Sequence, residues 1–316
     1  MKKISMVVPC YNEEGNVKLF FEDVLNTYKD SKKYKIELIF VNDGSSDNTL
    51  NELKEISKTT DFVVKILSFS RNFGKESVLY AGLKAATGDY TVLIDADMQQ
   101  PPRMTLKMAE ILDADKLVDC VCYYQESRIE GKLMSKIKGM FYGLMNKVSD
   151  VKLKQGASDF RMFRKNVKEA LLSLEERCRF TKGIFSWVGF NTSYLPYTPL
   201  ERVNGTSKWG SYKLFKYALE GIVSFSTKPL KLATILGLVL SLLSGIYLFV
   251  VLIQKIFIGI DIPGYPTIIT LILLIGGIQL FCIGIIGEYI SKIYMERKKR
   301  PIYIVKEEIT NDKKVK

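Results

Sequence analysis

The sequence of 316 residues contains no histidine. This absence excludes catalytic triads and metal sites that depend on an imidazole, so acid–base or metal chemistry must use Asp, Glu, Lys, Cys or Tyr. Cysteine is scarce as well: the five residues are an odd number without a disulfide framework, and Cys120 and Cys122 fall in an apolar run that is typical of a strand. The cysteine content therefore indicates a reduced, cytosolic compartment.

Negative charge is in deficit, with 46 Lys and Arg against 34 Asp and Glu and a net charge of +12. Six Lys and Arg but one Glu lie between residues 202 and 231, and nine Lys and Arg but four acids follow residue 290. Both windows flank apolar segments, a pattern typical of contact with anionic lipid headgroups. Nucleic acid is the weaker alternative and is not an expected partner, because the chain has no aromatic–basic motif of a known binding module.

Residues 1–125 alternate between strand-like and helix-like segments. The apolar spacing predicts strands over 4–8, 36–41, 63–68 and 90–94, and helices over 12–28, 49–58, 76–86 and 102–112. This rhythm predicts an α/β fold with a doubly wound, mostly parallel sheet. Right-handed crossovers then bring the loops that follow the four strands to one edge of the sheet.

Two long apolar segments, 232–253 and 268–287, are each long enough to span a bilayer. Their basic flanks predict a hairpin with both termini in the cytosol. We expect a cytosolic domain over residues 1–210, a juxtamembrane amphipathic helix over 211–229, transmembrane helices within 230–290, and a basic cytosolic tail over 291–316 that is disordered from residue 306. A further amphipathic helix over 132–148 faces either the core or the membrane.

Two carboxylates one residue apart, Asp95 and Asp97, follow the fourth predicted strand, where open α/β sheets place their ligands. Carboxylate oxygens are the ligands that Mg²⁺ or Mn²⁺ prefers, and such ions also hold substrate phosphates. Taken alone, Asp-x-Asp is more often a solvated turn, so the neighbouring loops decide. Asp43 follows the second strand and is suited to bind a ribose hydroxyl or a base N–H. Asp47 is expected to cap the next helix. Lys75 follows the third strand and brings a cation to the same edge.

Four motifs occur in order along the chain: Asp-Ala-Asp-Met-Gln-Gln-Pro-Pro at 95–102, Ser-Asp-Phe-Arg at 158–161, Arg-x-x-Gly-x-Ser-Lys-Trp at 202–209, and Ile-Gly-Glu-Tyr-Ile at 286–290. Together with the strand-end motifs they resemble the glycosyltransferase family 2 pattern on the nucleotide-diphosphosugar (GT-A) fold. The resemblance is closer still to the polyprenyl-phosphate glycosyltransferases, namely the bactoprenol glucosyltransferases and the dolichol-phosphate mannose synthase relatives. It extends from residue 4 to residue 305.

The resemblance implies a role for each matched residue. Asp159 would be the catalytic carboxylate, acting with Asp97 and Arg161, and Asp97 would bind Mg²⁺ or Mn²⁺ with Asp95. The implied nucleotide and donor contacts are Pro9, Tyr11, Glu13, Asp43, Lys75, Asp95, Asp97, Gln99, Arg202, Ser207 and Lys208, the last three on a mobile loop. The implied acceptor-phosphate contacts are Ser158, Arg161 and Arg128. Many relatives carry an acid where this chain has Gln100, so fewer carboxylates are left for the metal.

The expected activity is the inverting transfer of a sugar, from UDP-glucose or UDP-N-acetylglucosamine, to undecaprenyl phosphate at the cytosolic face of the plasma membrane. The product would serve cell-envelope glycan modification, and the resemblance implies a homo-oligomer, with a tetramer suspected. Because a phosphate monoester has a second pKa of about 6, the acceptor is mostly dianionic at pH 7, and Asp159 is expected to orient groups more than to remove a proton.

Three alternatives remain open from the sequence. The sugar could be transferred to another membrane lipid or to a polysaccharide, or the protein could be a non-catalytic, membrane-anchored nucleotide-sugar binder. A processive polysaccharide synthase fits less well, since it needs more spans and a Gln-x-x-Arg-Trp motif that the chain lacks.

Overall fold

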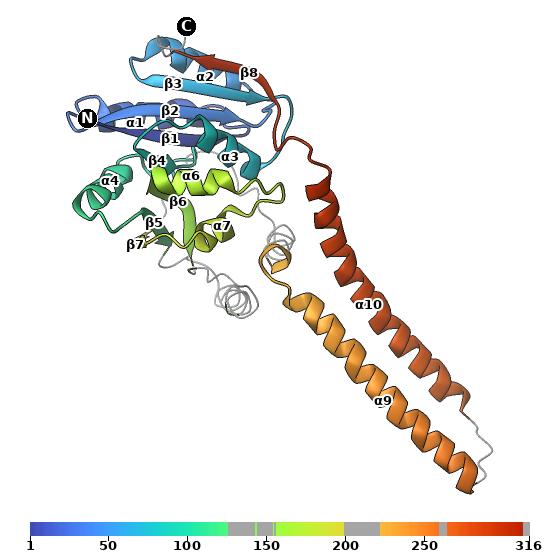
Figure 1. Cartoon of the computed structure of the whole chain (residues 1–316). Helices are drawn as coiled ribbons and strands as arrows, with labels where there is room; N and C mark the ends of the chain where they lie inside the picture. Colours follow the sequence, from blue (N-terminus) through green and yellow to red (C-terminus); the bar gives the residue numbers. More distant parts are fainter. Residues whose placement is uncertain (126–142, 144–153, 155, 199–221, 259–263, 312–316) are drawn as a thin grey trace.

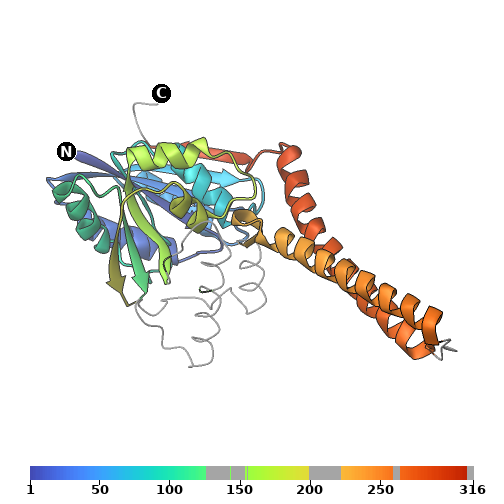
Figure 2. The same ribbon diagram turned by 60° about the horizontal axis from the view of Figure 1, so that its bottom comes forward.

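The computed structural model describes residues 1–125, 143, 154, 156–198, 222–258 and 264–311. A β-sheet with helices on both faces forms one part, and a long two-helix hairpin projects from it (Figures 1 and 2). Both described ends of the chain lie on the sheet part. The expected helix over 132–148 falls almost wholly outside the described residues, as does most of the juxtamembrane helix over 211–229.

The sheet has eight strands in the order β7-β5-β6-β4-β1-β2-β3-β8. The strands are β1 (Lys2–Cys10), β2 (Tyr34–Asn42), β3 (Val63–Phe69), β4 (Tyr90–Leu93), β5 (Cys120–Gln125), β6 (Ala157–Arg164), β7 (Thr192–Tyr197) and β8 (Val305–Thr310). β1, β2, β3 and β4 are parallel to one another, and β6 and β8 are antiparallel to their neighbours. The doubly wound, mostly parallel α/β sheet expected from the sequence is confirmed.

Helices alternate with the strands and cover the two faces of the sheet. They are α1 (Asn16–Tyr28), α2 (Thr49–Thr59), α3 (Lys75–Ala85), α4 (Met104–Ala114), α6 (Lys165–Ser173) and α7 (Thr181–Trp187). The helix expected from residue 12 begins only at Asn16, because Asn12 and Gly15 adopt φ values of 51° and 78° in the preceding turn. Asp47, which was expected to cap α2, accepts the backbone N–H of Thr49 at the first residue of the helix at 3.1 Å, although the cap position itself is Asn48.

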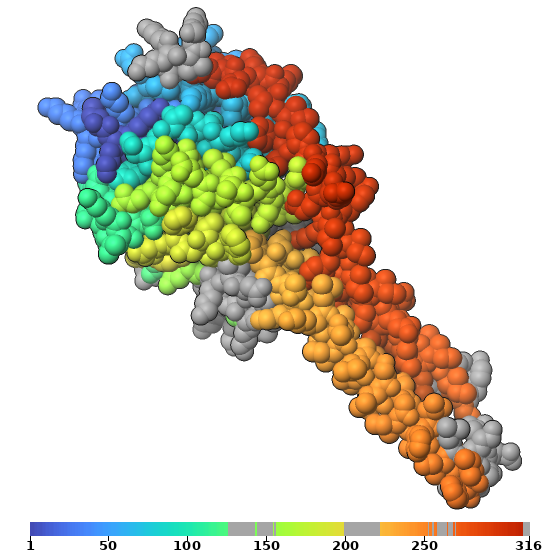
Figure 3. All heavy atoms as spheres, in the orientation of Figure 1, coloured from blue at the N-terminus to red at the C-terminus, as the bar shows by residue number. Residues whose placement is uncertain are grey.

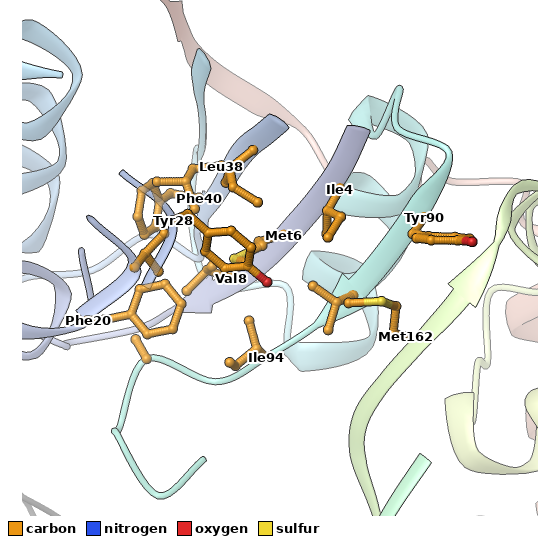
Figure 4. Close-up of a cluster of buried hydrophobic side chains, with 14 of the residues drawn as sticks. Ile4, Met6, Val8, Phe20, Tyr28, Leu38, Phe40, Tyr90, Ile94 and Met162 are labelled. Atoms are coloured by element: carbon orange, nitrogen blue, oxygen red, sulfur yellow. The ribbon is translucent and has the colours of Figure 1, made fainter. Parts of the chain in front are cut away.

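The core consists of two apolar layers, one on each face of the sheet. Ile4, Met6 and Val8 of β1 face the layer that α1, α2 and α4 cover, where Phe20 packs edge-on against Phe40 (Figure 4). The alternate side chains of the same strands face the layer that α3, α6 and α7 cover. Strands that are buried on both faces read as continuous apolar runs, which is why the sequence located them well.

The hairpin consists of α9 (Lys228–Ile258) and α10 (Tyr265–Arg297). Both are long and apolar enough to cross a membrane, over Lys228–Val251 and Thr270–Arg297, and neither apolar window is buried inside the protein. Figure 3 shows the two helices extending side by side from the sheet part. The two expected spans are thus present as helices, and α9 begins four residues before the predicted 232.

Hydrogen bonds hold the hairpin in place at the end that joins the sheet part. Tyr289 donates its hydroxyl to the carbonyl of Ser226 at 2.5 Å, next to the start of α9. At the end of α10 the Glu296 carboxylate accepts the backbone N–H groups of Arg177 and Cys178 at 2.7 and 2.9 Å. The Tyr289 bond joins α10 to the residues before α9, and the Glu296 bonds join α10 to the loop that precedes α7, so hydrogen bonds connect the hairpin to the sheet part.

The expectation of a disordered tail from residue 306 is wrong for the residues that form β8. This strand pairs antiparallel with β3, with Ile309 opposite Ile66, and Glu307 forms a 2.7 Å ion pair with Lys54. Asn311 closes the strand by accepting the Val64 N–H at 2.7 Å. Residues 305–310 therefore belong to the sheet of the first domain, although the chain reaches them only after the hairpin.

Candidate active site

The loops that follow β1, β2 and β3 are joined by hydrogen bonds at one edge of the sheet, as the crossover rule predicts. The N–H of Asn12 donates to Ser45 Oγ at 3.0 Å, which connects the first loop to the second. The N–H of Phe73 donates to Asp43 Oδ1 at 2.7 Å, which connects the second loop to the third. This edge holds the motifs that the sequence singled out.

Asp43 holds two of these loops together. It is 3% exposed, and its second oxygen accepts the N–H of Gly74 at 2.9 Å. Burial raises the pKa of its carboxyl above the ordinary value, although the two N–H groups favour the ionised form. Gly44 beside it has a φ of 65°, and a Cβ there would lie 2.6 Å from the backbone carbon of Arg71. Asp43 thus fixes the loop after β2 to the loop after β3. Its contact with the nucleotide stays a prediction.

The other predicted nucleotide residues lie along the same edge. Pro9 is in β1 opposite Val41 of β2. Tyr11 is exposed in the loop that follows, and Glu13 accepts the side-chain N–H of Asn16 at 2.7 Å. Their positions are compatible with a nucleotide that lies across the ends of β1 and β2.

The two carboxylates after β4 lie in a tight turn. Met98 has a φ of 58°, and Asp97 Oδ1 accepts the N–H of Gln99 at 3.2 Å across this turn. Gln100 donates its side-chain N–H to the hydroxyl of Tyr197 at 2.9 Å and so contacts β7. The structure therefore leaves Asp95 and Asp97 as the acidic pair of this turn.

Lys75 connects the Asp-x-Asp turn to the predicted catalytic carboxylate. Its ammonium lies 3.0 Å from Asp95 and 3.1 Å from Asp159. Burial alone would lower the pKa of Lys75, but the two carboxylates outweigh it and hold the pKa above its ordinary value. A single cation thus joins residues that are far apart in the sequence, which the strand-end motifs alone did not predict.

Asp159 stands at the start of β6 among cations. Besides Lys75, the ammonium of Lys182 lies 4.0 Å from its other oxygen. Burial would raise the pKa of Asp159, but Lys75, Lys182 and Arg161 outweigh it and hold the pKa well below the ordinary value. The residue is therefore a stable carboxylate and a weak base.

Two of the three residues predicted to bind the acceptor phosphate, Arg161 and Ser158, make contacts within the fold. Arg161 is 6% exposed, its guanidinium lies 4.2 Å from the ring centre of Phe185, and it donates to the carbonyl of Ser158 at 2.9 Å. Ser158 in turn donates its hydroxyl to the carbonyl of Tyr123 at 2.8 Å. Both residues support the strand that carries Asp159, and their contact with a phosphate stays a prediction.

Four predicted site residues lie outside the described residues: Arg128, Arg202, Ser207 and Lys208. Two residues of the site were not predicted. Lys182 stands in the first turn of α7, where a cation opposes the helix dipole, and this unfavourable placement was the signal available in the sequence. Glu76 lies beside Lys75, accepts the N–H of Thr181 at 2.9 Å, and has a pKa that burial raises to about 7.

The oxygens of Asp95 and Asp97 fit a hard divalent cation that is partly ligated by a substrate. Within the described part of the chain, no group of three or more His, Cys, Asp or Glu side chains could hold a metal ion. Mg²⁺ in particular commonly takes one or two protein carboxylates and completes its coordination with water and substrate phosphates. Asp95 and Asp97 match that pattern better than a site made of protein ligands alone.

Comparison with known proteins agrees with this geometry. The chain matches glycosyl transferase family 2 over residues 5–172 and the GtrB C-terminal hairpin over residues 228–293. It is 42% identical over 307 residues to the bactoprenol glucosyl transferase of Shigella phage SfV, and the aligned region covers 97% of this chain and 99% of that protein. It is 41% identical over 305 residues to the prophage bactoprenol glucosyl transferase homolog of Escherichia coli K12, with coverages of 96% and 98%.

A solved structure shares the fold of the sheet part. This is glucosyl-3-phosphoglycerate synthase from Mycobacterium tuberculosis, in complex with Mn²⁺, uridine diphosphate and phosphoglyceric acid. The TM-score is 0.50 at 19% identity, over 70% of this chain and 76% of that one. The likeness confirms the GT-A fold. With the family match over more than half of its length, the chain belongs to glycosyl transferase family 2, is a glycosyltransferase, and carries the GtrB C-terminal hairpin.

Proposed function

We propose that this protein transfers a sugar from a nucleotide-diphosphate sugar to a polyprenyl phosphate at the cytosolic face of the membrane. One observation carries the proposal: the same chain joins a glycosyltransferase site to an apolar hairpin, and the segment that contains α7 contacts both the site and the residues just before the hairpin. Lys182 of α7 lies 4.0 Å from Asp159, while Phe180, which precedes α7, packs against Phe225, close before α9. Relatives that are named bactoprenol glucosyl transferases and match almost the whole chain support the same acceptor.

The donor is proposed to bind along the ends of β1, β2 and β4. Asp95 and Asp97 would hold Mg²⁺ or Mn²⁺, and this ion, when bound, offsets the negative charge of the diphosphate. The loop that contains Arg202, Ser207 and Lys208 would close over the same group. A uridine nucleotide and a glucosyl or N-acetylglucosaminyl group are the proposed donor chemistry.

The residues of the chain suit an in-line displacement. An oxygen of the acceptor phosphate attacks the anomeric carbon, the bond from that carbon to the diphosphate breaks, and the configuration inverts to give a β-linked product from an α-linked donor. The phosphate is already mostly dianionic at neutral pH, since its second pKa is about 6. Asp159, whose pKa is held low, then orients the cations around the reacting groups and is not required as a strong base.

The membrane segment gives this arrangement a physical reason. Each buried CH₂ of a lipid tail contributes about 0.8 kcal/mol, so a long prenyl tail stays in the bilayer and the enzyme must act at the interface. We propose a plasma-membrane protein with two spans, with the sheet part and both termini in the cytosol. A homo-oligomer, with a tetramer as the suspected state, is proposed from the family resemblance and is testable by light scattering in detergent.

The test is a transfer assay with membranes that contain the full chain. Labelled UDP-sugars and GDP-sugars are supplied in turn with Mg²⁺ or Mn²⁺ and undecaprenyl phosphate, and the lipid is extracted and counted. We expect label in the lipid with a UDP-sugar, and a loss of transfer in Asp97→Ala but not in Asp61→Ala, an exposed residue before β3. Absence of labelled lipid with every donor would refute the proposed acceptor.

A further inference from the structure

Three cations surround Asp159 among the described residues, and they differ in how far each is already engaged. Lys75 is held between two carboxylates at 3.0 and 3.1 Å. Arg161 is 6% exposed and stacks on Phe185. The side chain of Lys182 is 28% exposed, and its ammonium lies 4.0 Å from Asp159, at the outer limit of an ion pair. Lys182 is thus the cation that can turn to an incoming anion at the smallest loss of existing contacts.

The backbone that carries Lys182 is fixed from two sides. Thr181 donates its N–H to Glu76 in the first turn of α3 at 2.9 Å, and its hydroxyl donates to the same carboxylate. On the other side Gly183 lies against Phe225, so closely that a Cβ at Gly183 would be 2.5 Å from the ring. These contacts leave the side chain of Lys182, and not its backbone, to move.

The position of α7 also matches the direction from which a lipid would arrive. Phe225 stands three residues before Lys228, where α9 begins. The polar head of a lipid whose tail stays beside this helix would reach α7 on its way to Asp159. An anionic head placed beside the Asp159 carboxylate needs a cation on that flank, and Lys182 is the described cation on it.

We propose that Lys182 binds the phosphate monoester of the acceptor and holds it beside the anomeric carbon. The inference rests on the proposed function and assigns its acceptor site to a residue outside the predicted set. A lysine ammonium is a compact charge on a flexible stem with three donors, which suits the exchange of a long contact with Asp159 for a closer contact with a phosphate dianion. Arg161 then supports the strand beneath the site.

The experiment compares Lys182→Ala and Lys182→Arg with Lys165→Ala, which removes a lysine whose side chain is 67% exposed on α6. Initial rates are measured with saturating donor and varied undecaprenyl phosphate. Loss of a charged hydrogen-bonding partner predicts an acceptor KM that rises about 10- to 100-fold in Lys182→Ala. We expect the donor KM and the hydrolysis of donor without acceptor to stay within about twofold, and Lys182→Arg to recover most of the acceptor affinity.

A binding measurement keeps the inference separate from the activity. Equilibrium dialysis of labelled farnesyl phosphate against the purified full-length chain without donor should show binding by the wild type and by Lys165→Ala, and weak binding by Lys182→Ala with an unchanged melting temperature. An unchanged acceptor KM in Lys182→Ala, or equal losses in hydrolysis and transfer, overturns the role of Lys182 and leaves the proposed function intact. If the wild type binds farnesyl phosphate through Lys182 but transfers no sugar to polyprenyl phosphate, the proposed function fails and the binding site stands. If the wild type does neither, both fail.

Discussion

Replacing Asp159 by Asn tests whether its carboxylate removes a proton or holds charges in place. The two side chains have nearly the same shape, so the change removes the charge and the basic oxygen with little loss of packing. In the wild type, burial would raise the pKa of Asp159, but Lys75, Lys182 and Arg161 outweigh it and hold the pKa well below the ordinary value. A carboxyl with a lowered pKa is ionised throughout the neutral range and produces no limb in a pH–rate profile there.

The size of the effect follows from the ion pair with Lys75. Two opposite unit charges at the 3.1 Å that separate Lys75 and Asp159 attract each other by roughly 5 kcal/mol at an effective dielectric constant of about 20. Both side chains are partly exposed and Lys75 keeps Asp95 as a partner, so solvent screening leaves about 2–3 kcal/mol. If that energy positions the cations in the transition state, kcat falls about 30- to 150-fold in Asp159→Asn.

The assay is the initial rate of transfer at saturating substrates from about pH 5.5 to about pH 9. Both enzymes should lose activity together below a pH of about 6, as the acceptor phosphate takes up a proton, and the ratio of their rates should stay constant. Asp61→Asn serves as the matched control and should follow the wild type. A ratio that shrinks steadily toward one as the pH rises would show that Asp159 removes a proton, and would refute the reasoning.

Three further predictions concern the metal, the hairpin and the packing of α3. Chelation with EDTA should abolish transfer, and Mg²⁺ or Mn²⁺ should restore it. Asp97→Ala should need a much higher metal concentration for half-maximal activity. A transfer rate that does not depend on metal would contradict the metal site at Asp95 and Asp97. Glu296→Ala removes the acceptor of two N–H groups, including that of Arg177. Charged hydrogen bonds contribute about 1.5–3 kcal/mol each before screening, so the melting temperature of Glu296→Ala in detergent should fall by several degrees. Glu296→Gln should recover much of the loss. Equal melting temperatures for the wild type and both variants would contradict the importance of the contact. Gly82→Ala places a Cβ in overlap with Val7 of β1; it should lower stability by about 1–3 kcal/mol, and a melting temperature equal to that of the wild type would show that α3 can shift.

The sequence predicts the four parallel strands β1 to β4 and the strand-like run of β5, but not β6, β7 or the edge strand β8. Runs such as β4 are buried on both faces and mostly apolar, and their pattern is visible without any knowledge of the partner strand. β8 carries charged residues between Val305 and Ile309, so its composition resembles a solvated tail. Its partner β3 lies more than 230 residues earlier in the chain, and only the three-dimensional pairing reveals which residues face inward.

The site was predicted better as a set of motifs than as a set of contacts. Asp95 and Asp159 were identified from the motifs that contain them, but nothing local in the sequence indicates that Lys75 lies between them. Asp43 was predicted as a nucleotide ligand because it follows a strand, and the structure shows that it also accepts two N–H groups of the next loop. The sequence alone does not reveal this second, structural role of Asp43, because the role depends on how closely the two loops approach each other.

The charges at the site explain why the donor and the acceptor need additional cations. Apart from Glu76, whose pKa burial raises to about 7, the described centre contains the carboxylates Asp95, Asp97 and Asp159 and the cations Lys75, Arg161 and Lys182. They roughly balance before any substrate is present. A nucleotide diphosphate and a phosphate monoester together bring several negative charges into a partly buried space, where an unpaired charge costs several kcal/mol. A divalent ion on the Asp-x-Asp turn would add two positive charges at the donor end, and Lys182 turned from Asp159 would bring an existing positive charge to the acceptor phosphate. Lys75, held between the two ends, would then lie close to the bond that breaks, where its charge can stabilise the departing diphosphate.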